Sequence, residues 1–302
     1  MRNKKLIIAW ISILVLLIIA GVSAYAWERH TFASSNKAIA VVQHGEVLVS
    51  QPDGTMQAFT GQIELLPGQT LQTLDGEALL TINSDFFIWL RTNSQLTLQT
   101  LNASDIDVKL TDGAAWYMHV NASAPQQFTL YTPLDTITPY GTKFYVTYDA
   151  NTKETSTILV QGSATVSDEF GRIYLTPVEK AYKTDINGLR LVGLTPDDMD
   201  IVQSQLKKDY AILTDARMQE INKYGVALNI IKSKYNVTDD DIKYILNQVD
   251  TGKISEDDLI KQSPVPLPNL DRIRAITDEA KSTLQVQQSI DQQNQQVSAS
   301  SN

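Results

Sequence analysis

The sequence contains no cysteine, and this absence removes several kinds of chemistry at once. Without thiols the chain has no disulfides, no Cys-ligated zinc or iron–sulfur site and no thiolate nucleophile. It also lacks a Gly-x-Ser-x-Gly elbow, a Ser-x-x-Lys pair and a glycine-rich phosphate loop. We therefore expect a protein that is not an enzyme and that holds no cofactor and no metal.

Positive charge is also scarce. The chain has 25 Lys and Arg against 34 Asp and Glu, a formal net charge of -9, and no basic run long enough to form a concentrated basic face. Binding to duplex nucleic acid requires such a face, so nucleic acid is not expected as a partner. With 302 residues and 43% hydrophobic content, the chain is long enough for one sizeable core or two smaller ones, and we expect two folded units.

An apolar run occupies the N-terminus. It extends from Leu6 to Val22 with only Ser12 as an interruption, and residues 6–27 as a helix would be about 33 Å long, enough to cross a bilayer. Three basic residues precede it (Arg2, Lys4 and Lys5), which by the positive-inside rule places the stub 1–5 in the cytoplasm. The sequence thus predicts a single-pass signal anchor in a bacterial cytoplasmic membrane, with the bulk of the chain outside the cytoplasm.

The same residues have an alternative interpretation as a secretory signal peptide. Ala24-Tyr-Ala26 is a small-x-small cleavage site, and cleavage after Ala26 would release a secreted protein. Either way the chain is exported. Small and polar residues 31–37 then form a short linker.

Residues 38–192 predict an all-β domain. About fifteen short β-prone runs follow one another, with alternation of apolar and polar residues at 96–98, 128–130 and 144–148. Turn residues separate the runs, as in Pro52-Asp-Gly54. Because no helical periodicity interrupts them, we expect an antiparallel sandwich or a short coil of strands.

The pattern of apolar residues changes from the two-residue period of strands to the period of a helix at Thr195-Pro196. This dipeptide is a helix start, with an N-cap hydroxyl and a proline at the first helical position. An apolar stripe from Leu206 to Tyr235, broken by Arg217, predicts one long amphipathic helix with a kink near Gly225. A helix of that length exceeds the needs of a small bundle, so self-association through it is a further expectation.

Shorter elements follow. Thr238 to Asp241 predicts the cap of a second helix that runs to about Val249, and Ser255 to Asp258 caps a third, which completes a helical domain over 195–262. The remaining predictions are a Pro-rich linker over 263–269, a helix over 270–285 that packs back on the long one, and a disordered tail over 286–302.

An ordered series of strand-and-turn motifs across residues 40–180 resembles the FecR family. The most specific of them is Thr132-Pro133 followed by Gly141-Thr-Lys-Phe144. The motif residues, to which we assign a structural role, are Gly45, Pro67, Gly68, Gly76, Gly113, Thr132, Pro133, Gly141, Thr142, Phe144 and Gly162. The resemblance covers about half of the chain and identifies a fold rather than a chemistry.

The resemblance implies the extracytoplasmic, all-β part of membrane proteins that relay a signal from an outer-membrane transporter to a cytoplasmic sigma factor. In that family a substantial cytoplasmic segment holds the sigma factor, whereas here Met1 to Lys5 is too short for such an interface. We therefore expect a membrane-anchored sensor or interaction module with an envelope or membrane protein as partner. The alternatives are a sigma-factor regulator that acts through a membrane partner, and an envelope structural protein that binds cell wall or other glycans.

Three groups of residues have both a functional and a structural interpretation. His30, His44 and His119 lie far apart without acids at metal-ligand spacing, which favours ordinary surface or core positions. Residues 247–258 resemble a calcium loop but lack its ligands at two positions, so a Gly-capped turn between helices is favoured. Five aromatic residues could stack on a glycan, but such residues more often pack in the core on both sides of a strand. They are Phe86, Phe87, Trp89, Trp116 and Tyr117.

Overall fold

A computed structural model describes residues 36–300, apart from 121–126, 262–269 and several positions between 224 and 235. The chain divides into two units, residues 1–37 and Ala38–Asn302. The predicted stub 1–5, membrane helix 6–27 and most of the linker 31–37 lie outside the described residues, as does the Pro-rich linker 263–269. Among the helices that are described, none has the length and apolar character needed to cross a membrane.

Fifteen strands lie between Ala38 and Val192, and the described residues of this region contain no helix, as predicted. The strands are β1 (Ala38–His44), β2 (Val47–Ser50), β3 (Met56–Ala58), β4 (Gln62–Glu64), β5 (Thr70–Thr73), β6 (Glu77–Ile82), β7 (Phe86–Leu90), β8 (Ser94–Leu101), β9 (Asp105–His119), β10 (Gln127–Tyr131), β11 (Thr136–Asp149), β12 (Glu154–Ser167), β13 (Arg172–Leu175), β14 (Glu179–Thr184) and β15 (Arg190–Val192). All pairings are antiparallel except that of β9 with β10.

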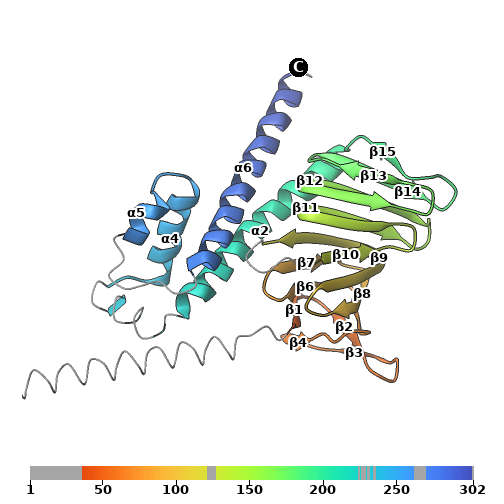
Figure 1. Cartoon of the computed structure of the whole chain (residues 1–302), viewed down its shortest axis with the longest axis horizontal. Coiled ribbons are helices and arrows are strands. Elements are labelled where there is room, and N and C mark those ends of the chain that lie inside the picture. The colour runs from red at the N-terminus through yellow and green to blue at the C-terminus, as the bar shows by residue number, and fades with distance from the viewer. Residues whose placement is uncertain are drawn as a thin grey trace, which may run out of the picture. The chain divides into compact units, whose positions relative to one another are not determined.

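The strands form one hydrogen-bonded sheet that folds into two layers, because its three long strands bend (Figure 1). In β9, for example, residues 106–112 pair with β8, whereas residues 113–119 pair with β7 and β11. Layer A contains β4, β1, β6, β7, the second half of β9, the second half of β11, the first half of β12, β14 and β15. Layer B contains β3, β2, β5, β8, the other halves of β9, β11 and β12, β10 and β13.

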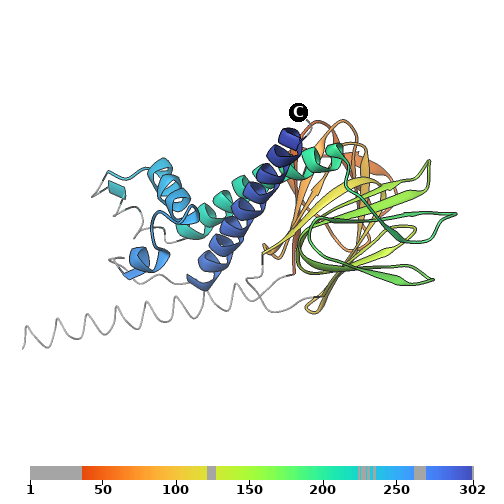
Figure 2. The same cartoon turned by 90° about the horizontal axis from the view of Figure 1, so that it is seen from above.

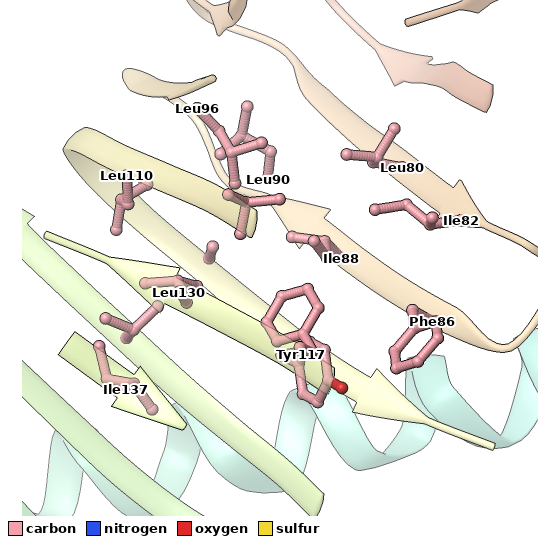
Figure 3. Close-up of a cluster of buried hydrophobic side chains, with 14 of the residues drawn as sticks. Leu80, Ile82, Phe86, Ile88, Leu90, Leu96, Leu110, Tyr117, Leu130 and Ile137 are labelled. Carbon is pink, nitrogen blue, oxygen red and sulfur yellow. The ribbon is translucent and has the colours of Figure 1, made fainter. Parts of the chain in front are cut away.

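The main core lies between the two layers. Leu80, Ile88 and Tyr117 from layer A pack with Leu96 and Leu130 from layer B, and all of them are buried (Figure 3). Successive residues on a strand point to opposite faces, so every second residue of each long strand joins this core. The arrangement agrees with the sandwich alternative, since two layers enclose one apolar interior.

Four described helices follow the sheet: α2 (Pro196–Asn222), α4 (Asp239–Asp250), α5 (Glu256–Lys261) and α6 (Leu270–Ser300). Thr195 and Thr238 cap α2 and α4 through reciprocal hydrogen bonds with Asp198 and Asp241, which confirms both predicted starts. The prediction that one helix continues to Tyr235 is wrong. The helix ends at Asn222 with Lys223 as its C-cap, close to the kink predicted at Gly225, where φ is +43°.

The predictions of a helix limited to 270–285 and of a disordered tail over 286–302 are also wrong, because α6 extends to Ser300. Two apolar residues anchor this extension: Ile290 is buried against the sheet, and Val286 packs beside it. The Gln-rich composition around them suits a helix, since glutamine has a high helix propensity.

The helices α2 and α6, called here the helical layer, cover the outer face of layer A, the face turned away from layer B. Val202, Leu206 and Ile290 contact one apolar cluster of that face, while Leu213 and Ile276 contact another. Figure 2 shows both helices on the same side of the strands. The predicted packing of the last helix on the long one is confirmed. Sheet and helices belong to one unit, which differs from the two folded units expected from length alone.

Candidate functional site

The motif residues of the β region lie at turns, bends and close contacts of the two layers. Gly113, Gly141 and Gly162 have positive φ and lie where β9, β11 and β12 pass from one layer to the other. A Cβ on Gly162 would lie 2.3 Å from the carbonyl oxygen of Gly141, so the bend requires glycine. The other motif glycines are Gly45 and Gly76, which are in backbone contact, and Gly68, which follows Pro67 in a turn.

Thr132-Pro133 forms the turn between β10 and β11. The Thr132 hydroxyl donates to Asp135 Oδ1 at 2.6 Å and accepts from the backbone N–H groups of Leu134 and Asp135. Burial raises the pKa of Asp135 to about 6, and the hydrogen bond from Thr132 partly opposes this. This part of the motif therefore builds a turn in which Thr132 and Asp135 are buried and hydrogen-bonded, while Pro133 is exposed.

Gly141-Thr-Lys-Phe144 does more than shape the strand, because its residues face both sides of layer A. Thr142 and Phe144 are buried, and Phe144 belongs to the main core. Lys143 lies between them and points to the opposite face, and its side chain is also fully buried. A lysine at 0% exposure needs partners of its own, and it finds them under the helical layer.

The partners of Lys143 come from three elements. Its Nζ donates to Gln161 Oε1 at 3.0 Å on β12 and forms an ion pair with Glu279 on α6. Asp209 on α2 is a further charge beside it, and the Trp116 Nε1–H of β9 donates to Asp209 Oδ2 at 3.0 Å. We call Lys143, Asp209, Glu279, Gln161, Trp116 and Gln205 the Lys143 cluster.

Burial is the largest cause of the pKa shifts of the two innermost ionisable groups, Asp209 and Lys143. It raises the pKa of Asp209 to about 7, although Lys143, Trp116 and Gln205 each favour the ionised carboxylate. It lowers the pKa of Lys143 to about 8, which the charge of Asp209 partly offsets. Both groups thus titrate near neutral pH at the centre of the sheet–helix interface.

Further charge pairs join the edges of the helical layer to the sheet. Lys208 on α2 lies 3.0 Å from Glu77 on β6, and Lys180 on β14 lies 2.9 Å from Asp198 on α2. On α6, Arg272 pairs with Asp85 and donates to the backbone carbonyl of Ser84. Charge pairs at the centre and at the edges of the outer face thus accompany the two apolar clusters that pack layer A against its helices.

The five aromatic residues singled out in the sequence are buried. Phe86 and Tyr117 join the main core, Phe87 contacts the helical layer, and Trp89 and Trp116 lie under α2. Core packing on both sides of a strand, the structural interpretation, is thus what the fold contains. The chain's own helices cover Phe87, Trp89 and Trp116, whereas Phe86 and Tyr117 lie between the two layers, so the five residues do not form one face.

A second buried network attaches α4 to α2. Arg217 makes two hydrogen bonds of 2.6 Å to Asp250, both side chains are 0% exposed, and the Tyr210 hydroxyl donates to the same carboxylate at 2.8 Å. This pairing explains why Arg217 interrupts the apolar stripe. Because Asp250 is occupied and Gly252, with φ of +71°, caps the turn, residues 247–258 form the predicted Gly-capped turn. Among the described residues no group of metal ligands was found.

The histidines that the sequence offered as metal-ligand candidates do not form a group. His44 is exposed and lies 3.5 Å from Glu77, His119 is stacked on Phe86 at 4.3 Å, and His30 lies outside the described residues. Burial lowers the pKa of His119.

A polar cleft of about 690 Å³ lies between the α4–α5 turn and α6, and another of about 380 Å³ lies beside Pro133 and Phe170.

Sequence reasoning missed the Lys143 cluster, although two signals point to it. Lys143 stands between Thr142 and Phe144 in a strand that is buried on both sides. Asp209 lies three residues after Leu206 and four before Leu213, which is the spacing of the buried stripe of α2. A charged residue at a position that the pattern assigns to the core indicates a buried partner.

Comparison with known proteins identifies the central part of the sheet. Residues 69–165 match the family model described as FecR protein, which confirms the resemblance over about a third of the chain. The matched range runs from the start of β5 into β12 and contains Lys143. It leaves out Gly45, Pro67 and Gly68. No curated protein matches the chain.

Two crystal structures of a proposed anti-sigma factor from Parabacteroides distasonis ATCC 8503 are similar to parts of the chain. Both are 14% identical to it, with TM-scores of 0.37 and 0.38. The similarity covers 40% and 41% of this chain and 57% and 59% of those chains. The chain thus spans less than three fifths of the length of the solved structures that it matches.

Proposed function

We propose that the chain is a non-enzymatic FecR-type signalling module, tethered to a bacterial cytoplasmic membrane, that senses or transmits a signal through contacts with another envelope protein. The observation that carries this proposal is the FecR match over residues 69–165, located in a sheet whose outer face is bound to a helical layer through the FecR motif itself. Lys143 of that motif connects the matched region to both helices.

The state of the most perturbed charges supports a role in binding rather than catalysis. Lys143, Asp135 and Asp209 have strongly shifted pKa values, yet each is buried and paired with other side chains. A general acid or base must reach a substrate. None of these three groups lines the cleft beside the α4–α5 turn or the cleft beside Pro133 and Phe170.

The membrane tether rests on sequence. The apolar run 6–27 follows Arg2, Lys4 and Lys5, which favours a cytoplasmic N-terminus and an extracytoplasmic body. Reporters that are active only inside or only outside the cytoplasm, fused after Asn302, test this placement. We expect activity of the outside reporter, and a cytoplasmic signal would overturn the placement. Release of the body into the medium would instead favour cleavage after Ala26.

Photo-crosslinking in intact cells tests the proposed partner. Phe170, in the turn between β12 and β13, is 82% exposed, and Ile186, in the turn between β14 and β15, is 85% exposed. Both residues line the cleft beside Pro133. A photoreactive phenylalanine at position 170 should therefore crosslink to one defined envelope protein. The matched control is position 117, which is buried in the core and should give no product. Equal products at both positions would contradict a specific contact.

A second candidate is a sigma-factor regulator that acts through a membrane partner. The FecR match favours it, because that is the role the family resemblance implies. Deletion of the gene should then change transcription of a defined set of promoters, and the protein crosslinked at position 170 should be a membrane protein. Unchanged transcription together with a crosslink to a soluble envelope protein would leave only the first candidate.

A further inference from the structure

The sheet has a core that does not depend on the helical layer. All buried members of the main core, from Ala38 to Ala181, belong to the sheet region. The contacts with α2 and α6 belong to two other clusters on the outer face of layer A. Separation of the helical layer would thus leave the main core closed, which is the condition for a local opening that precedes global unfolding.

The interface that would open contains ionisable groups at its centre. One charge comes from each of three elements: Lys143 from layer A, Asp209 from α2 and Glu279 from α6. The neutral groups that face them are Gln161, Gln205 and the indole of Trp116. When the helices separate, water solvates all of these groups, so the docked and undocked states bind protons differently.

Asp209 gives the larger difference in proton binding between the docked and undocked states. Docking raises its pKa from an ordinary value of 3.8 to about 7, because burial penalises the carboxylate. The docked state therefore binds an additional proton between these two values. Docking is stabilised as the pH falls through 7 and loses this stabilisation as the pH rises.

Lys143 changes the stability of docking in the opposite direction, and it does so over a higher pH range. Docking lowers its pKa from 10.5 to about 8, so the docked state releases a proton and gains stability above pH 8. At pH 5.5 the amine is protonated in both states and contributes no difference. Between pH 5.5 and pH 8 the effect of Asp209 therefore dominates.

We propose that the Lys143 cluster makes docking of the helical layer onto layer A pH-dependent, with a docking equilibrium on the order of tenfold more favourable at pH 5.5 than at pH 8. Undocking exposes apolar side chains of the outer face, among them Trp116, Tyr145 and Val160, to water.

Hydrogen exchange of the full chain in detergent micelles tests the proposal. We expect amides of α6 around Ile276 and Ile290 to exchange through an opening that leaves β7 protected. After correction for intrinsic exchange, and in the regime where closing outpaces exchange, their protection should be about tenfold higher at pH 5.5 than at pH 8. Asp209→Asn, which mimics the protonated acid, should abolish that ratio. Exchange of α6 only together with β7, or an unchanged ratio in the variant, would overturn the proposal.

Two further variants keep the test decisive if Asp209→Asn fails to fold. Trp116→Phe removes a hydrogen bond that holds the pKa of Asp209 down, so the pH at which α6 protection changes should move upward. Asp135→Asn is the matched control, because Asp135 also has a raised pKa but belongs to the β10–β11 turn. It should leave the pH ratio of α6 unchanged. A shift with Asp135→Asn and none with Trp116→Phe would contradict the assignment to Asp209.

Discussion

Both faces of layer A bury apolar side chains, but the outer face also buries charges, and two adjacent residues of β11 show the difference. Phe144 points inward and packs with apolar side chains of the main core. Lys143 points outward and is buried among charged and amide groups of β12, α2 and α6. Burial of apolar area stabilises a fold, whereas a buried ion pair contributes little net stability and specifies which groups must meet. The inner face thus holds the sheet together, and the outer face selects its helices.

Truncation of Phe144 should have the largest effect. Phe144→Ala leaves a cavity in the main core and is expected to cost about 3–5 kcal/mol of unfolding free energy at every pH. Urea unfolding of the full chain at pH 5.5 and pH 8 measures this cost. Tyr140→Ala, at a position 59% exposed on the same strand, is the control and should cost less than about 0.5 kcal/mol. A pH-dependent loss for Phe144→Ala would break the contrast between the faces.

Lys143→Met should cost less, and its cost should depend on pH. Removal of the amine leaves Glu279 and the ionised Asp209 without a cationic partner; because burial lowers the pKa of Lys143 to about 8 and the amine is only partly protonated at that pH, we expect a cost of about 2 kcal/mol at pH 8. At pH 5.5 Asp209 is protonated, since burial raises its pKa to about 7, so the cost should be smaller. The same urea titrations decide this point. An equal loss at both pH values would show that Lys143 acts by packing alone.

Gly162→Ala tests the bend that the two faces share. The residue has φ of +83°, and a new Cβ would meet the backbone of Gly141, so we expect a loss of about 1–3 kcal/mol. Gly171→Ala is the matched control, because its Cβ would meet nothing and its φ is not positive. Thermal unfolding of both variants provides the measurement. Similar melting temperatures for the two would mean that β12 does not need a glycine to pass between layers.

The smallest effect is expected at the start of the helical layer. Thr195→Ala removes the N-cap of α2 and should cost about 1 kcal/mol. This loss should appear in the hydrogen exchange of α2 and α6 and not in that of β7. Ser204→Ala, at an exposed position of α2, should stay within about 0.5 kcal/mol of the parent chain. A loss shared equally by β7 would indicate that sheet and helices open as one.

Local rules predicted much of the fold. The fifteen strands, the helix starts at Thr195 and Thr238 and the Gly252 cap follow from alternation, capping and turn chemistry, which act over a few residues. The aromatic residues Phe86, Phe87 and Trp89 also favoured core packing on both sides of a strand, and β7 is buried on both sides. Pattern alone identifies a face that must be covered, but it does not identify what covers it.

The Lys143 cluster and the length of α6 could not be predicted in the same way. Lys143 and Glu279 are 136 residues apart, so their pairing depends on how the sheet and the helices are packed together. Ile290, one apolar residue among glutamines, extends α6 only because a cluster on layer A is there to receive it. Contacts of this kind become visible only when the faces are assembled.

Removal of the helical layer tests whether the sheet folds by itself. Residues 36–193 should retain β-type circular dichroism and a cooperative unfolding transition, because the main core contains sheet residues only. They should also bind a hydrophobic dye that residues 36–302 do not bind, since the outer face is uncovered. Loss of the cooperative transition in residues 36–193 would contradict the claim that the sheet is complete by itself and the helices are docked onto it.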